Sequence, residues 1–254
     1  MLGKLLKWEF LSTARTILPV YAGAVLLAGL IALLGMPWNV DADSEVLTAA
    51  SGFLFFFFVL ALFAVAFLTF ILIIRRFYKS LFKDQGYLSH TLPVSVDTQL
   101  WSKLIAAVCW SFASALIIFL SLLLMAARQW AVIDFDTVAN VLREAFGEIG
   151  WFLALRIIFY VILSTLSGFL MVYASMSIGQ LAKRRKILLS VGVYFGMSYA
   201  LSILMTVIPM AMYFSAPTVD FSLWIDFLGI FTLIQCVGFY FITRSILRYK
   251  LNLE

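Results

Sequence analysis

Residues 46–74 read VLTAASGFLFFFFVLALFAVAFLTFILII, and Arg75 and Arg76 follow them directly. This stretch contains no charged residue, and it exceeds the roughly 20 apolar residues that a helix needs to cross the hydrocarbon core of a bilayer. Because lipid offers no hydrogen-bond partner to the backbone, an uncharged run of this length predicts a membrane-spanning α-helix.

Five further uncharged intervals lie on either side of this run: 16–40, 104–127, 157–182, 187–219 and 227–243. We therefore predict six transmembrane helices, over about 17–36, 50–74, 104–125, 152–182, 187–213 and 222–243. The 254 residues are 64% hydrophobic and only 12% charged, a charged share about half that of a soluble domain. The predicted fold class is an all-α membrane protein with one transmembrane domain over residues 1–254.

The basic residues predict the orientation of these helices. Fifteen of the eighteen lysines and arginines lie in four segments, which are the N-terminus, 75–103, 183–186 and the C-terminus from Arg244. The alternate segments carry nine of the thirteen acidic residues. The positive-inside rule then places both chain ends in the cytoplasm of a cell-membrane protein. Since topology accounts for the net charge of +5, no nucleic-acid partner is implied.

Two polar segments are expected to lie along the membrane surface. Residues 1–15, MLGKLLKWEFLSTAR, mix leucines with basic residues and predict a short helix on the cytoplasmic face, or else a solvated start to the first span. In the outer segment 126–150, apolar residues at helical spacing predict an amphipathic helix capped at Asp136.

Helix pairing is also readable from the sequence. The four basic residues 183–186 leave so short a connection that the spans 152–182 and 187–213 should form an antiparallel hairpin. Small residues four apart, at Ser164 and Gly168 and again at Ser175 and Gly179, allow close helix approach. Cys109 and Cys236 both fall inside spans and are interpreted as small core residues.

The sequence holds no pattern that indicates catalysis. His90 is the single histidine, so a histidine-based metal site or a serine–histidine pair within the bilayer is excluded. No span carries paired carboxylates, and no G-x-x-x-x-G-K-[S/T] motif occurs. We therefore assign no catalytic residue, no metal ligand and no cofactor to this chain. Arg156 and Asp226, near the outer boundary, are expected to be interfacial or paired residues.

The segment 75–103, RRFYKSLFKDQGYLSHTLPVSVDTQLWSK, carries the functional prediction. Residues 75–82 can continue the second span, and Gly86 suits the turn that ends it. Tyr87, Leu88, Leu92 and Pro93 form an apolar patch whose exposure is explained only by contact with the membrane surface or with a protein.

The run Asp84-Gln85-Gly86-Tyr87-Leu88-Ser89-His90-Thr91-Leu92-Pro93, followed by Gln99-Leu100-Trp101-Ser102-Lys103, resembles the segment between the second and third helices of ABC-2-type transporter permeases. The small six-helix permeases of Gram-positive bacteria are the most similar in layout. Leu5-Leu6-Lys7-Trp8-Glu9-Phe10 likewise resembles the elbow helix of that family. The specific motif covers about ten residues, whereas the layout covers the whole chain.

This resemblance implies the permease subunit of an ATP-binding cassette exporter. Two permease subunits, identical or different, would each dock on a separately encoded ATPase subunit, which holds the ATP and magnesium. The helix around 78–92 would be the coupling helix, with the ATPase contact made by Lys83, Asp84, Gln85, Gly86, Tyr87 and Leu88. The expected cargo is amphipathic or hydrophobic, such as a peptide, a drug or a lipid.

Two other functions stay open from the sequence. The chain could be a membrane-embedded sensor or accessory subunit without transport activity, in which case segment 75–103 is a surface loop folded on the lipid headgroups. It could also be a membrane enzyme, although no catalytic constellation supports that class. A P-loop ATPase encoded by a neighbouring gene would favour the exporter over both.

Overall fold

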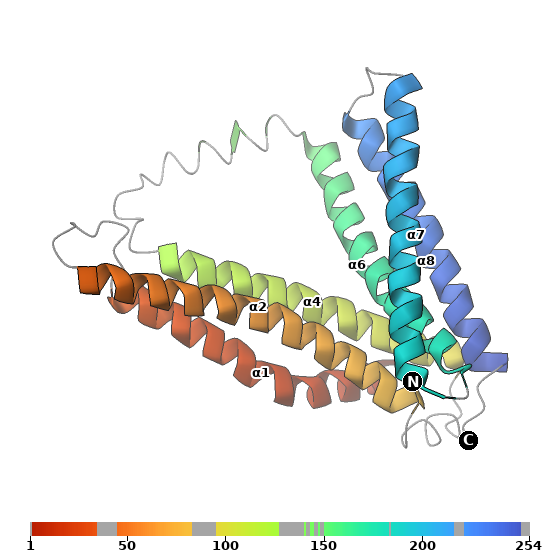
Figure 1. Cartoon of the computed structure of the whole chain (residues 1–254), viewed down its shortest axis with the longest axis horizontal. Helices are drawn as coiled ribbons and strands as arrows, with labels where there is room; N and C mark the ends of the chain where they lie inside the picture. The colour runs from red at the N-terminus through yellow and green to blue at the C-terminus, as the bar shows by residue number, and fades with distance from the viewer. Residues whose placement is uncertain are drawn as a thin grey trace. The chain divides into compact units, whose positions relative to one another are not determined.

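The computed structural model describes residues 2–34, 45–82, 95–126, 140, 143, 144, 147, 150–182, 184–215 and 221–249. Within these ranges the chain forms helices and turns and no strand. The six long helices are α1 (Leu2–Leu34), α2 (Glu45–Phe82), α4 (Val96–Ala126), α6 (Trp151–Gly179), α7 (Lys186–Ser215) and α8 (Phe221–Tyr249), coloured in chain order in Figure 1.

Each of these six helices is long and apolar enough to cross a membrane. The prediction of an all-α protein with six membrane-crossing helices is therefore confirmed for the described residues. Each predicted span lies largely within one of the helices. The side of the membrane on which each end lies stays a prediction.

Several helices extend well beyond the uncharged intervals. The α1 helix begins at Leu2 and continues through Pro19, so residues 2–15 are its first turns and not a separate element. The α2 helix runs to Phe82, as the sequence predicted, whereas α4 already begins at Val96. Lysine, arginine, leucine and glutamine are good helix formers. Charge therefore marks where the hydrocarbon layer ends, while the helix itself continues.

The described residues divide into two compact units. One unit, made of Lys7–Ile73 and Cys109–Glu148, packs α1 against α2 and α4. Its core contains Ile17 and Tyr21 of α1 next to Val65 of α2. A second cluster joins Ala28 and Ile31 of α1 to Phe58 of α2. Since the residue numbers rise in α1 as they fall in α2, the two helices are antiparallel.

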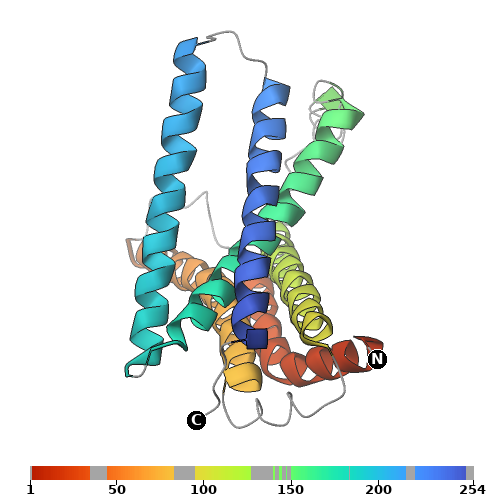
Figure 2. The same cartoon turned by 90° about the vertical axis from the view of Figure 1, so that its right-hand side faces the viewer.

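The other unit contains Met1–Leu6, Ile74–Val108 and Ile149–Glu254. It packs α6 against α8 and α7, and Figure 2 shows α6 crossing α8 and meeting α7 near the turn between them. The predicted hairpin of the fourth and fifth spans is confirmed by this turn. A Cβ on Gly179 would lie 2.8 Å from the Lys186 carbonyl oxygen of α7. Gly168, by contrast, has no described atom within 4 Å of the place where its Cβ would be, so its expected close approach is not made within this part of the chain.

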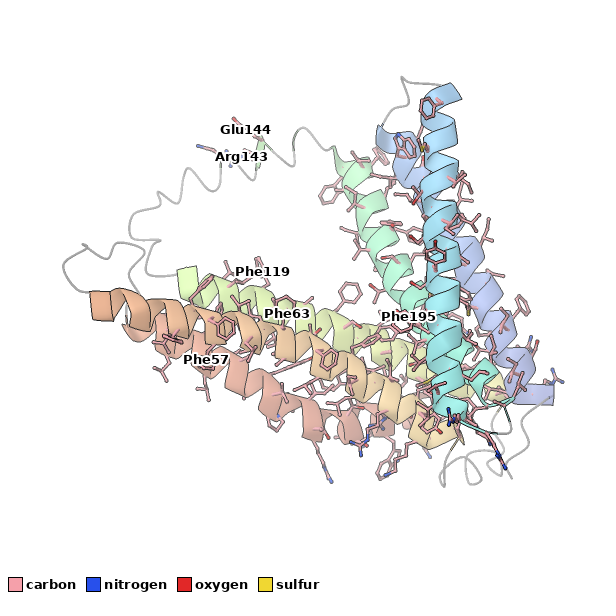
Figure 3. All side chains as sticks on the ribbon, in the orientation of Figure 1. Phe57, Phe63, Phe119, Arg143, Glu144 and Phe195 are labelled. Carbon is pink, nitrogen blue, oxygen red and sulfur yellow. The ribbon has the colours of Figure 1, made fainter. Side chains whose placement is uncertain are left out.

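Large apolar side chains cover the outside of both units. Phe57 and Phe63 of α2 and Phe119 of α4 stand away from their ribbons, and Phe195 does so on α7 (Figure 3); all four are more than half exposed. Such faces are stable in lipid, which removes the penalty that water imposes on apolar surface.

The two cysteines are both free thiols. Cys236 is buried, as predicted, but the interpretation of Cys109 as a core residue is wrong because that side chain is exposed. A thiol is apolar enough to face lipid, so membership of a span does not place it in a protein core. In the segment 126–150, residues 140, 143, 144 and 147 are helical and exposed. Asp136 and the rest of the predicted amphipathic helix lie outside the described residues.

Candidate functional site

The six predicted ATPase-contact residues, Lys83, Asp84, Gln85, Gly86, Tyr87 and Leu88, lie outside the described residues. The structure describes instead the two helix ends that flank them. These are the last turns of α2, from Ile74 to Phe82, and the first turns of α4, from Val96 to Val108. Both belong to the unit that contains α6, α7 and α8.

The end of α2 is amphipathic and packs on α6. Phe77 and Leu81 are each 1% exposed, while Arg75 and Lys79 are exposed. Residues four apart on a helix share a face, so Phe77 and Leu81 point to the same neighbour. The ring of Phe77 stacks on that of Tyr173 of α6, with centroids 3.6 Å apart and planes 3° apart. This apolar contact holds the end of α2 on α6.

The start of α4 is defined by a serine cap. The Ser95 side-chain oxygen accepts a hydrogen bond from the backbone N–H of Thr98 at 3.3 Å, and the Ser95 carbonyl accepts one from the Gln99 N–H at 3.2 Å. Serine is favoured at this position because its hydroxyl satisfies an amide that the helix leaves unpaired. Side chains in the second turn of α4 are already buried, since Leu100 is 0% and Ser102 2% exposed.

A polar cluster joins this helix start to α8. The Asp97 carboxylate lies 2.8 Å from Nε of Arg244 and accepts a hydrogen bond from the Tyr240 hydroxyl at 2.6 Å. The Trp101 ring, one turn further along α4, lies against the Tyr240 ring at 5.9 Å. An ion pair this exposed contributes about 0–1 kcal/mol, whereas a hydrogen bond to a charged group contributes about 1.5–3 kcal/mol. The Tyr240–Asp97 bond is therefore the stronger link.

Three polar contacts then connect α8 to α6. Arg156 lies 3.1 Å from Asp226 near the N-terminal ends of the two helices. Each was expected to be an interfacial or a paired residue, and the structure shows that they pair with each other. The Ser167 hydroxyl donates to Gln235 at 3.2 Å, and the Cys236 thiol donates to the Leu163 carbonyl at 3.6 Å. Since residue numbers rise together along both helices, α6 and α8 run parallel, and these contacts link residues 156–167 of α6 to residues 226–236 of α8.

The other unit has its own polar centre. The Tyr21 hydroxyl of α1 donates to the Trp110 carbonyl of α4 at 3.2 Å and lies 3.2 Å from the hydroxyl of Thr69 on α2. Thr69 in turn donates to the Val65 carbonyl of its own helix. One tyrosine thus ties three helices together. Polar residues within membrane spans can bond neighbouring helices in this way.

The described contacts of this unit join helix ends to α6 and α8. Among the described residues no group of three or more histidine, cysteine, aspartate or glutamate side chains could hold a metal ion. What the described residues form is a junction, in which the end of α2 contacts α6 and the start of α4 contacts α8.

Sequence reasoning missed Asp97, Tyr240 and Phe77 as contributors to this junction. A signal for Asp97 was present, because Ser95 followed by an acidic residue two positions later is typical of a helix N-terminus. Its partners were not readable, since Tyr240 lies 143 residues away. No protein-family model, curated protein or solved structure matches the chain.

Proposed function

We propose that this chain is the membrane-spanning permease subunit of an ATP-binding cassette exporter. It has no catalytic residue of its own, and a separate ATPase subunit binds and hydrolyses ATP with magnesium. Two permease subunits pair in the cell membrane, with the N- and C-termini of each in the cytoplasm. The cargo is an amphipathic or hydrophobic molecule, such as a peptide, a drug or a lipid.

The observation that carries this proposal is the anchoring of the segment 83–94 at both ends. Phe77 is stacked on α6 just before it, and Asp97 is bonded to α8 just after it. A loop that only closed a connection between two spans would not need two such contacts. A coupling helix does need them, because it must pass a push from the ATPase to helices elsewhere in the chain.

The sequence supports the same assignment. Lys83, Asp84, Gln85, Gly86, Tyr87 and Leu88 resemble the ATPase-contact segment of ABC-2-type permeases. Charged and aromatic side chains next to a helix-ending glycine suit a small protein–protein contact, in which a few anchor residues contribute most of the binding energy. The first turns of α1 serve as the elbow helix at the cytoplasmic face, with Trp8, 72% exposed, at the headgroup layer.

The test is purification of the tagged chain from its native membrane, followed by identification of the proteins that accompany it. A P-loop ATPase should co-purify with the wild-type chain. Charge reversal at Asp84 combined with Tyr87→Ala should abolish that association, because it removes both the charge and the aromatic anchor. The double variant should still insert into the membrane in normal amounts.

The matched control is Arg184→Glu, a charge reversal at an exposed residue of the other basic connection. This variant should retain the ATPase. Undiminished association and ATP-dependent export in the Asp84 and Tyr87 double variant would contradict the assigned contact. An ATPase that binds without any nucleotide-dependent export would favour the accessory subunit.

A further inference from the structure

We propose that Asp97, Tyr240 and Arg244 form a latch that makes α8 follow movements of the start of α4. The inference rests on the proposed function, since it names the helix that receives the push from the ATPase. In these terms the three side chains are positioning residues, which neither touch cargo nor take part in hydrolysis.

The latch is placed where the segment ends. Asp97 lies in the first turn of α4, three residues beyond position 94. Its carboxylate is the point at which two side chains of α8 converge, at 2.6 Å from the Tyr240 hydroxyl and 2.8 Å from Arg244 Nε. Tyr240 and Arg244 are four apart, so both project from one face of α8.

The latch and the Phe77–Tyr173 contact are held by different kinds of interaction. Stacked rings such as Phe77 and Tyr173 keep most of their attraction when one slides across the other, because dispersion has little directionality. Hydrogen bonds to a carboxylate weaken steeply when their angle or length changes. A movement of the start of α4 that keeps both bonds intact therefore requires α8 to move with it.

The movement can reach the far end of α8. Fourteen residues separate Tyr240 from Asp226, which is roughly 21 Å of helix at 1.5 Å per residue. Over that distance Ser167–Gln235 and Arg156–Asp226 tie α8 to α6. A tilt that starts at the latch thus arrives at the Arg156–Asp226 end as a movement of two linked helices.

The experiment measures movement at the Asp226 end of α8 directly, and the cargo does not have to be known. A single cysteine is introduced by Leu223→Cys, near the start of α8 and 55% exposed, in a chain that also carries Cys109→Ser and Cys236→Ser. The permease with its co-purified ATPase is placed in lipid nanodiscs. The rate of maleimide labelling at position 223 is measured without nucleotide and after trapping with magnesium, ATP and vanadate.

In this parent chain, trapping should change the labelling rate by about fivefold or more, the low end of typical coupling between sites. In the variant Asp97→Asn with Tyr240→Phe, ATP hydrolysis should persist while the labelling rate no longer responds to trapping. The exchange variant Asp97→Arg with Arg244→Asp restores an ion pair and should recover most of the response. Replacement of Phe63 by Leu, where the side chain is 73% exposed, is the control that leaves the latch intact, and it should respond as the parent does.

A nucleotide response that survives unchanged in Asp97→Asn with Tyr240→Phe overturns the latch but leaves the proposed function standing. If the double variant loses its ATPase altogether, the cluster holds the docking surface in shape and the latch is likewise rejected. Failure of the proposed function is recognised at the purification step, before any labelling, because no P-loop ATPase then accompanies even the parent chain.

Discussion

Phe77 of α2 and Tyr173 of α6 lie face to face, with ring centroids 3.6 Å apart and planes only 3° apart. Both side chains are 1% exposed, and they are among the largest fully buried residues described. Because the two residues are far apart in sequence, their contact fixes a tertiary arrangement and not a local one. The end of α2 is thereby held on the same helix that pairs with α8.

The first prediction concerns this contact. Replacement of Phe77 by Ala should lower the free energy of unfolding by about 1–3 kcal/mol, from the lost ring contact and the cavity that remains. The loss should be smaller than in a water-soluble core, since lipid removes most of the hydrophobic transfer term. Thermal unfolding of the purified chain in detergent, followed by size-exclusion chromatography, measures the change.

The control for Phe77 is Phe63→Ala on the same helix, where the side chain is 73% exposed. This substitution removes the same atoms without opening a cavity in the protein, so the midpoint of unfolding should hardly change. Equal losses in the two variants would show that the stacked pair contributes nothing special to stability.

The second prediction concerns the turn between α6 and α7. A Cβ on Gly179 would collide with the Ser190 side chain and lie 2.8 Å from the Lys186 carbonyl oxygen. Gly179→Ala should therefore destabilise the chain by about 1–3 kcal/mol, the usual cost of overpacking. The effect is measurable as a lower unfolding midpoint and as a smaller yield of monodisperse protein.

Gly168 offers the opposite case on the same helix, since no described atom lies within 4 Å of the position that an added methyl group would take. Gly168→Ala should be neutral or stabilising by up to about 1 kcal/mol, because alanine is the better helix former. A loss at position 168 as large as that at 179 would indicate that Gly168 packs against another subunit.

The third prediction concerns the Tyr21 hydroxyl, which joins α1 to α2 and α4. Tyr21→Phe keeps the ring and removes only the hydroxyl, so the expected loss is about 0.6 kcal/mol and no more than about 1.7, as for other polar contacts within membranes. Tyr199→Phe, on the exposed face of α7, is the matched control and should cost nothing measurable. A Tyr21→Phe variant more stable than wild type would mean that the hydroxyl is poorly satisfied.

The membrane-crossing helices could be predicted from the sequence because lipid imposes one simple requirement, an unbroken apolar run. The same reasoning located the α6–α7 turn. It also placed Arg156 and Asp226 near a boundary as interfacial or paired residues, but that they pair with each other is known only from the structure. The predicted helix ends were less accurate than the predicted spans. The α4 helix begins at Val96 and not near 104, because a Ser95 cap starts a helix before the apolar run does.

Contacts that depend on distant residues could not be predicted. Asp97 is one acid in a basic segment, and nothing near it indicates that Tyr240 and Arg244 supply its partners. Cys109 illustrates a related limit, because a small residue in a span can face either lipid or protein. Periodicity did not separate these cases, since exposed and buried faces of these helices are both apolar.

The last prediction concerns the side of the membrane on which each connection lies. Glu144 and Arg184 are both exposed, in connections predicted to face the outside and the cytoplasm respectively. In a chain with Cys109→Ser and Cys236→Ser, a membrane-impermeant maleimide should label Glu144→Cys in intact cells. Arg184→Cys should be labelled only after the cells are made permeable.

Arg143→Cys, the neighbouring position, should repeat the result for Glu144→Cys and guards against a purely local effect on thiol reactivity. The opposite pattern, with position 184 labelled from outside, would invert every helix and place residues 83–94 away from any cytoplasmic ATPase. Labelling at 184 also reports on the side of the Phe77 contact, because Arg184 follows α6, whose Tyr173 stacks on Phe77. A cytoplasmic position for Arg184 is therefore a condition that the proposed function must meet.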